Sequence, residues 1–293
     1  HVKKGNPADV FVTDGSVEGV SDRGYAENTV GARLAPAMGK GDKDVVERDT
    51  GWKPLGKVLL GKPVVEADVL INLSHVKGHG AAAFGGACKN LAMGCVPPGE
   101  RRRMHILEGN LKWLKDKCTH CKKCIEECQR KANRFSASGD YEIFWHNCTG
   151  CLHCMLACPV KAIQVVDCDV KLFQEGLARM AKAVLDCFEP GHVFNINVLT
   201  QITIFCDCWG LTTPSLVPDI GIMAGEDLVA VDQASLDAVE VKNLIPGSIT
   251  PPYKLGKGKH LFEKLHAKDP YVQGKVLERL GAGTSRYRLV EVK

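Results

Sequence analysis

The stretches KCTHCKKCIEEC at residues 117–128 and NCTGCLHCMLACP at residues 147–159 decide how this chain is interpreted. Each stretch holds three cysteines separated by two residues and a fourth cysteine three residues further on. This double spacing is typical of bacterial-type proteins that bind two [4Fe–4S] clusters. Zinc is the alternative for CxxC pairs, but zinc sites use paired CxxC units rather than three evenly spaced thiolates with an exchanged fourth.

The spacing also predicts which cysteines share a cluster. The fourth cysteine of each run lies on a helical turn that directs it away from the first three, so it ligates the other cluster. The two expected ligand sets are Cys118, Cys121, Cys124 with Cys158, and Cys148, Cys151, Cys154 with Cys128.

Length and composition set broad limits. A chain of 293 residues can form one large domain or two smaller ones. The net charge of +4 is too small to indicate a nucleic-acid partner, and no apolar stretch reaches the roughly 18 residues of a membrane helix. The chain starts with His1 rather than Met, so the native N-terminus and any targeting segment are expected upstream. Free thiols and low-potential clusters both favour the cytoplasm of an anaerobe.

Residues 117–167 are predicted to form a ferredoxin module inserted into a larger domain. The two parts of that domain are then residues 1–116 and 168–293. Strands and helices alternate on both sides of the module, which indicates a layered α/β fold.

Hydrophobic periodicity and turn residues predict the individual elements. Residues 67–73 (ADVLINL) are nearly all apolar, so we expect a strand buried on both faces. Asp232 is expected to be the N-cap of a helix over residues 233–244. The other expected elements are strands at 10–13, 193–205, 220–223 and 288–292 and helices at 85–94, 170–188 and 272–280.

Three segments carry a family resemblance. They are EADVLINLSHVKGHGAAAFGGACKNLAMGC (Glu66–Cys95), FCDCWG (Phe205–Gly210) and VPDIGIMAGEDLVAVDQASLD (Val217–Asp237). Together with the cysteine runs they resemble the ferredoxin-bearing branch of the family called domain of unknown function 362. The resemblance implies an iron–sulfur protein and names no substrate. This chain departs from the usual pattern, because Gln129 follows Cys128 where proline is usual, and we expect a changed turn and changed hydrogen bonds to that sulfur.

Candidate residues for a second site follow the strand at 67–73. His75, Lys77 and His79 alternate there and can face the same way on an extended segment. Ligands of open α/β sheets bind beyond the carboxyl ends of strands, so these residues predict a metal or anion site. The alternative is a polar loop with one hydrogen-bonded histidine.

Cys206 and Cys208, with Asp207 between them, follow another predicted strand. They fit a mononuclear metal site, a redox thiol or a cysteine near a cluster. The alternative is a buried structural thiol, because free cysteine packs as a small apolar residue.

Two further positions complete the candidates. Lys89 and Asn90 lie on the glycine-bounded helix, where a lysine and the helix N-terminus can bind an anionic substrate or a flavin phosphate. A surface lysine is the alternative. Asp219 lies near a strand end and is a candidate general acid.

These observations favour an oxidoreductase that passes single electrons through two [4Fe–4S] clusters to a site in the α/β domain. The expected catalytic residues are His75, Lys77, His79, Lys89, Cys208 and Asp219, and the expected cofactor-binding residues are Lys89, Asn90, Cys206 and Asp207. A flavin or a mononuclear metal there would couple one-electron supply to two-electron chemistry. The redox partner is a ferredoxin-like donor or a larger complex, and a homo-oligomer stays open. The alternatives are a non-catalytic electron carrier or complex subunit, and a factor that matures metal centres or clusters.

Overall fold

The computed structural model describes residues 11–14, 26–39, 43–128, 131–143, 153–166, 169–209, 212–250 and 253–292. The chain divides into two compact units. The first unit comprises residues 1–97 and 174–293, and the second unit comprises residues 98–173. The chain therefore leaves the first unit once and later returns to it.

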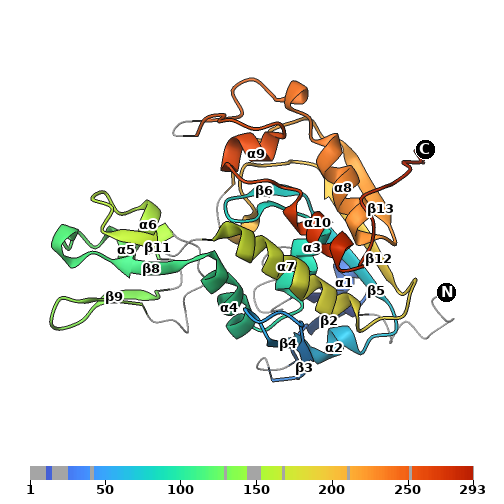
Figure 1. Cartoon of the computed structure of the whole chain (residues 1–293), viewed down its shortest axis with the longest axis horizontal. Helices are drawn as coiled ribbons and strands as arrows, with labels where there is room; N and C mark the ends of the chain where they lie inside the picture. The colour runs from blue at the N-terminus through green and yellow to red at the C-terminus, as the bar shows by residue number, and fades with distance from the viewer. Residues whose placement is uncertain are drawn as a thin grey trace. The chain divides into compact units, whose positions relative to one another are not determined.

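The first unit mixes short strands and helices in an α/β fold (Figure 1). Before the second unit its elements are β1 (Phe11–Asp14), α1 (Glu27–Val30), β2 (Arg33–Pro36), β3 (Val45–Asp49), β4 (Lys57–Gly61), α2 (Lys62–Val65), β5 (Leu70–His75), β6 (Lys77–His79), β7 (Ala83–Gly85) and α3 (Ala87–Gly94). After it come α7 (Val170–Leu185), which begins at the end of the second unit, and β12 (Val193–Leu199), η5 (Asp207–Trp209), β13 (Gly221–Gly225), α8 (Leu228–Ala238), η6 (Val241–Asn243), α9 (Leu261–His266) and α10 (Val272–Arg279).

The central sheet of the first unit has the strand order β13-β12-β5. β12 runs parallel to β5, with Val193 opposite Leu70 and Val198 opposite His75, and β13 pairs antiparallel with the other edge of β12. β5 precedes the second unit in sequence and β12 follows it. If the predicted α/β domain is continuous across the ferredoxin module, residues 58–95 and 192–245 should lie in one sheet or in adjacent layers, and the pairing of β5 with β12 confirms this.

This sheet buries its polar face and leaves its apolar face open. Asn195 and Asn197 of β12 are 0% exposed, whereas Ile71 of β5 and Ile222 of β13 are 62% and 65% exposed. Neighbouring side chains of a strand point to opposite faces, so the asparagines share the buried face and the isoleucines the open one. The expectation of a strand over residues 67–73 buried on both faces was wrong, because β5 starts at Leu70 and buries only one face.

A polar network lies on the buried face. Asn72 donates to the side chain of Asn195 at 2.9 Å, and Asn197 donates to Asp232 at 2.8 Å and to Ser235 at 2.9 Å. Buried polar groups of this kind cost free energy unless they are hydrogen-bonded. Each partner therefore fixes the position of the next, and the network ties α8 to the sheet.

Asp232 does not cap the helix that follows it, contrary to the sequence expectation. α8 begins at Leu228 and its N-cap is Asp227, whose side chain accepts from the backbone N–H groups of Val229 and Ala230. Asp232 lies inside α8, buried, and its carboxylate accepts from the N–H groups of Ala87 and Cys88 at 2.7 and 2.9 Å. It therefore caps the start of α3 from another helix, where the N–H groups and the helix dipole favour a negative charge.

The second unit contains short strands and single helical turns. Its elements are α4 (Pro98–Glu108), β8 (Asn110–Trp113), η4 (Lys115–Lys117), α5 (Lys123–Glu126), β9 (Asn133–Phe135), β10 (Tyr141–Ile143), α6 (His153–Leu156) and β11 (Ile163–Val166). β8 pairs antiparallel with β11, and β9 pairs antiparallel with β10. Both cysteine runs fall within this unit.

Other predicted elements have mixed outcomes. The glycine-bounded helix and the helix near residue 272 are present as α3 and α10. The helix predicted to reach residue 188 ends at Leu185, and the strand predicted to reach residue 205 ends at Leu199. The strand expected at residues 288–292 is absent from that described segment. Within the described ranges, no helix combines the length and the apolar character needed to cross a bilayer.

Candidate functional site

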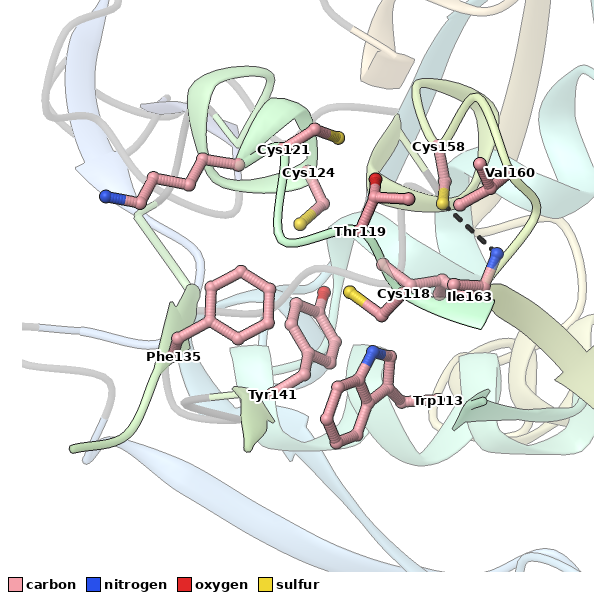
Figure 2. A pocket seen from close by; sticks show the side chains of 12 residues that line it. Trp113, Cys118, Thr119, Cys121, Cys124, Phe135, Tyr141, Cys158, Val160 and Ile163 are labelled. Carbon is pink, nitrogen blue, oxygen red and sulfur yellow. Dashed lines mark hydrogen bonds between the residues drawn. The ribbon is translucent and has the colours of Figure 1, made fainter. Parts of the chain in front are cut away.

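Four cysteines from both runs line one small pocket in the second unit. They are Cys118, Cys121, Cys124 and Cys158. Figure 2 shows the sulfur atoms of Cys118 and Cys124 pointing toward the same space, beside the ring of Tyr141. The first three cysteines lie within eleven residues of one run, and the fourth reaches the pocket from the end of the other run.

Aromatic and aliphatic side chains enclose this pocket. Trp113, Phe135 and Tyr141 lie around it, and their ring centroids are 5.7 to 6.3 Å apart. The indole Nε1 of Trp113 is buried and has no hydrogen-bond partner among the described residues. Burial raises the pKa of Cys124 to about 11, and the neighbouring thiols add to the increase. A backbone hydrogen bond favours the Cys124 thiolate, but burial and the neighbouring thiols outweigh it, so the charged form would depend on a bound metal.

The two runs repeat the same local geometry at their fourth cysteines. The backbone N–H of Ala132 donates to Cys128 Sγ at 3.2 Å, and the N–H of Ala162 donates to Cys158 Sγ at the same distance. Lys131 and Lys161, which precede these alanines, both have a positive φ, of 52° and 51°. The hydrogen bond to Cys128 is therefore formed although Gln129 replaces proline, contrary to the expectation that it changes.

The other predicted ligand set is only partly described. Cys154 is buried and packs in the core of the second unit with Cys124 and Ile163. Cys148 and Cys151 lie outside the described residues. Across the described ranges, no three His, Cys, Asp or Glu side chains lie close enough to hold a single metal ion. A single ion needs donors that converge at about 2.0–2.3 Å, whereas the four irons of a cluster take ligands spread around a cavity.

A second group of polar side chains gathers in the first unit, around the segment that follows β12. Lys77 of β6 is buried, and its Nζ lies 2.6 and 2.7 Å from the two carboxylate oxygens of Asp207. His79 of β6 is also buried, and its Nε2 lies 3.4 Å from Cys208 Sγ. The structure therefore joins residues that are 130 and 129 positions apart in the sequence.

Lys89 of α3 completes this group. Its Nζ lies 3.7 Å from Cys206 Sγ. A hydrogen bond from Cys208 lowers the pKa of Cys206 to about 5; burial opposes this shift and the positive charge of Lys89 adds to it. The same hydrogen bond, with burial, raises the pKa of Cys208. Burial lowers the pKa of Lys89, but the negative charges at Cys206, Cys208 and Asp207 outweigh it and leave that pKa above its ordinary value.

Gly78, between the two site residues of β6, is required by a close backbone approach. A Cβ on Gly78 would lie 2.2 Å from the carbonyl oxygen of Ile204 and 2.8 Å from Nε2 of His266. The N–H of Gly78 donates to Thr203 at 3.0 Å, and His266 Nε2 contacts the Ile204 oxygen at 2.9 Å. The missing side chain therefore lets the segment that leads to Cys206 pack directly on β6.

Three of the predicted site residues make other contacts. The exposed His75 hydrogen-bonds through Nε2 to the backbone oxygen of Thr200. Asn90 donates to Asn72 at 2.8 Å and so belongs to the polar network of the sheet. Asp219 accepts from the backbone N–H of Gln201 at 2.7 Å.

Sequence reasoning missed two contributors to this group. Gly78 could have been found from its place between Lys77 and His79, since a glycine inside a strand marks a close approach of another backbone. The role of Asp232 in positioning the start of α3, and hence Lys89, cannot be recognised from the residues next to Asp232 in the sequence. The contact joins residues 145 positions apart.

Two curated relatives share short segments with this chain. A segment of 47 residues is 43% identical to the Hdr-like menaquinol oxidoreductase iron-sulfur subunit 1 of Archaeoglobus fulgidus, covering 15% of this chain and 18% of that protein. A segment of 51 residues is 39% identical to the pyruvate synthase subunit PorD of Methanocaldococcus jannaschii, covering 17% of this chain and 59% of that protein. In both cases this chain spans less than two thirds of the relative.

One family model covers most of the chain. It describes a domain of unknown function, DUF362, and matches residues 1–237. The match includes both cysteine runs, the segment of β6 and the Cys206–Cys208 segment. Because it extends over more than half of the 293 residues, the chain belongs to the DUF362 family.

Proposed function

We propose that this protein is an iron–sulfur oxidoreductase in which two [4Fe–4S] clusters pass single electrons to or from a redox site in the first unit. The observation behind the proposal is the pocket lined by Cys118, Cys121, Cys124 and Cys158. This is the set that crossed ligation between two runs requires. One of the relatives is named as the iron-sulfur subunit of an oxidoreductase, and the other is named as a pyruvate synthase subunit.

The residues around the pocket fit a cluster. When bound, a [4Fe–4S] cluster supplies reversible one-electron transfer. Trp113 offers a buried N–H beside the thiols that lacks a hydrogen-bond partner in the described part of the chain. The N–H groups of His120 and Ala162 donate to the sulfurs of Cys118 and Cys158, at 3.4 and 3.2 Å. Such hydrogen bonds, together with exclusion of water by the aromatic rings, are what tune a cluster's potential.

The group around Cys208 supports an enzyme rather than a bare electron carrier. A ferredoxin module alone does not require the first unit, in which the buried Lys77 and His79 contact an exposed aspartate and an exposed cysteine. Perturbed titratable groups that cluster at a surface opening are a common property of active sites. The flavin or mononuclear metal expected from the sequence stays a prediction.

The second candidate function is an electron-transferring subunit of a larger redox complex. It is favoured by the names of both relatives, each of which is a subunit of an enzyme. In that case the first unit would bind the other subunits of the complex and would have no catalytic role. A metal- or cluster-maturation role also stays a prediction.

Metal and sulfide analysis of anaerobically purified protein tests the proposal. We expect about eight iron atoms and about eight inorganic sulfides per chain, and a reduced sample with the EPR signals of interacting [4Fe–4S] clusters. Bound zinc in place of iron, or a single cluster, would contradict it. Visible absorption of the same sample shows whether a flavin accompanies the clusters.

A His79→Ala variant distinguishes the two candidate functions, an enzyme and an electron-transferring subunit. An enzyme should lose turnover with a low-potential donor while keeping its iron and its EPR signals. A subunit should keep full electron transfer to a partner protein. Asn243→Ala, in η6 of the same unit, is a matched control because Asn243 belongs to neither group of site residues.

A further inference from the structure

A continuous row of polar contacts runs through the group in the first unit. It leads from the Lys89 ammonium to Cys206 Sγ at 3.7 Å, then through a hydrogen bond to Cys208, and on to His79 Nε2 at 3.4 Å. The four residues come from α3, from η5 and the residue before it, and from β6. Cys206 and Cys208 thus occupy the centre of the row, between Lys89 on one side and His79 on the other.

The charges of this row favour one thiolate shared by two sulfurs. Cys206 carries the negative charge, stabilised by the Cys208 thiol and by Lys89, and Cys208 keeps the proton. Among the described contacts, Asp207 is the other charged group that acts on both sulfurs, where it opposes thiolate formation, and its carboxylate also pairs with the Lys77 ammonium. A protein-stabilised thiolate beside a thiol is the usual state of a reactive dithiol.

The imidazole of His79 is held as a donor toward sulfur. Its Nδ1 accepts from the backbone N–H groups of Ala81 and Ala82 at 3.1 and 3.0 Å. In the neutral ring the proton then resides on Nε2, which points at Cys208 Sγ. A metal ligand needs a free lone pair at that nitrogen. The orientation therefore favours thiol chemistry over a mononuclear metal at this position.

The two sulfurs differ in access. Cys208 is exposed, while Cys206 is only partly so. A disulfide substrate can therefore reach Cys208 first. Proton transfer across the hydrogen bond to Cys206 would place the thiolate on Cys208, where the His79 N–H stabilises it.

We propose that Cys206 and Cys208 form a redox-active dithiol that reduces disulfide substrates and is restored by electrons from the clusters. The inference deepens the proposed function, on which it rests for the electron supply. In the first half, the Cys208 thiolate attacks a substrate disulfide and Cys206 resolves the mixed disulfide. One S–S bond breaks, the Cys206–Cys208 bond forms, and the substrate leaves as one thiol and one thiolate. In the second half, two electrons from reduced clusters and one proton from solvent reopen the bond to a thiol and a thiolate.

The test uses the full chain with its clusters, purified without oxygen. The protein is equilibrated with mixtures of reduced and oxidised glutathione, quenched with acid, and labelled with a maleimide. We expect the peptide that holds both cysteines to lose two labels together, in a single two-electron transition. Cys208→Ser should abolish the transition. Cys187→Ser, which removes a partly buried thiol of another segment, should leave it unchanged.

Lys89 variants check that the protein stabilises the thiolate. At pH 7, alkylation of Cys206 in a Cys208→Ala background should be about tenfold slower after Lys89→Met, because less thiolate is present. Lys89→Arg should restore most of the rate. Unchanged alkylation in Lys89→Met, with Lys275→Met as the surface control, would overturn the assignment of this thiolate.

Iron analysis and EPR of the same samples separate the two ideas. Protein that holds both clusters but whose two cysteines stay reduced in every mixture overturns the dithiol and leaves the proposed function standing. Protein whose cysteines cycle but that binds no iron overturns the proposed function and leaves the dithiol standing.

Discussion

In the pocket of the second unit, burial raises the pKa of Cys124 to about 11, whereas in the first unit the Cys208 thiol and Lys89 lower the pKa of Cys206 to about 5. Cys124 is buried, and Cys206 is partly buried. The difference lies in what surrounds them: other thiols and aromatic rings at Cys124, but an ammonium and a thiol donor at Cys206. The comparison teaches that the first type of site needs an external positive centre to hold a thiolate, while the second supplies its own.

The largest expected effect is the loss of a whole cluster, and it tests whether the cysteines of the second unit are cluster ligands. Cys158→Ser should remove the cluster on Cys118, Cys121 and Cys124, although it lies in the other run, and should lower iron by about four atoms per chain. Cys128→Ser should instead remove the cluster on the second run. EPR of the two variants identifies the cluster that remains.

The opposite EPR pattern, with each variant losing the cluster of its own run, would show that the ligand sets do not cross. Cys206→Ser, which changes a cysteine of the first unit, serves as the control. It should leave both clusters and the iron content unchanged.

The second effect concerns the buried carboxylate that supports Lys89. Asp232→Ala leaves the N–H groups of Ala87 and Cys88 and the amide of Asn197 without their acceptor in the interior. Each buried group without a partner costs about 1–3 kcal/mol, so we expect a loss of about 3 kcal/mol in the free energy of unfolding. Denaturant unfolding followed by circular dichroism measures it.

Asp227→Ala is the matched control, because it removes an aspartate that caps its own helix and should cost about 1 kcal/mol. If both variants lose the same small amount, Asp232 is not the structural support described here. Iron content should stay constant in both, since the second unit is not altered.

The third effect is steric and should displace Cys206 and Cys208 without affecting the clusters. Gly78→Ala places a Cβ against the Ile204 carbonyl, so the segment before Cys206 must move. Overpacking of this kind costs about 1–3 kcal/mol, and we expect faster alkylation of the displaced cysteines with unchanged iron. Thermal unfolding and maleimide labelling provide the two readouts.

Gly94→Ala provides the contrast for this substitution. An added Cβ there meets nothing within 4 Å, and alanine in a helix is favoured over glycine by roughly 0.5–1 kcal/mol. A Gly78→Ala protein as stable as the Gly94→Ala protein would disprove the close packing of β6 on the Ile204 segment.

The smallest expected effect is a pH dependence of the first unit. Burial lowers the pKa of His266 to about 4, against a smaller opposing effect of its hydrogen bond to Ile204. The unfolded histidine titrates near 6.5, so between about pH 6.5 and 4 the unfolded state binds more protons. The free energy of unfolding should therefore decrease as the pH is lowered through this window, by about 2 kcal/mol once partial solvent access is allowed for.

His266→Asn keeps a donor for the Ile204 oxygen and removes the titration. The variant should show a weaker pH dependence in the same window in chemical unfolding experiments. An unchanged dependence would assign the effect to other groups, such as the buried His260, whose pKa burial also lowers.

Several features of the fold were predictable because they are local. The run from Cys118 to Cys128 encodes its own turns, since ligands two and three residues apart are set by one stretch of backbone. The glycine-bounded helix α3 and the amphipathic helix α7 follow from breakers and from the 3.6-residue period. The family signature through β5, β6 and η5 pointed to the segments that meet in the first unit.

The choice of buried face was not predictable from β5 and β12. An alternating strand shows that its two faces differ, but which one is covered depends on what packs there. Here α3 and α8 cover the asparagines, because Asp232 of α8 accepts hydrogen bonds both from Asn197 and from the start of α3. The apolar residues Ile71, Leu73 and Phe194 are consequently on the open face, at 62%, 61% and 40% exposure.

By itself, the sequence determined the cysteine spacing, the family and the short segments that hold His79, Lys89 and Cys208. Only the tertiary structure decided that Lys89 meets Cys206 across 117 positions and that His79 meets Cys208 across 129. It also separated His75, Asn90 and Asp219 from that group. The physical reason is that backbone geometry sets contacts within a turn or two, whereas contacts over such distances arise when buried polar groups and close-packed glycines find their partners in the folded core.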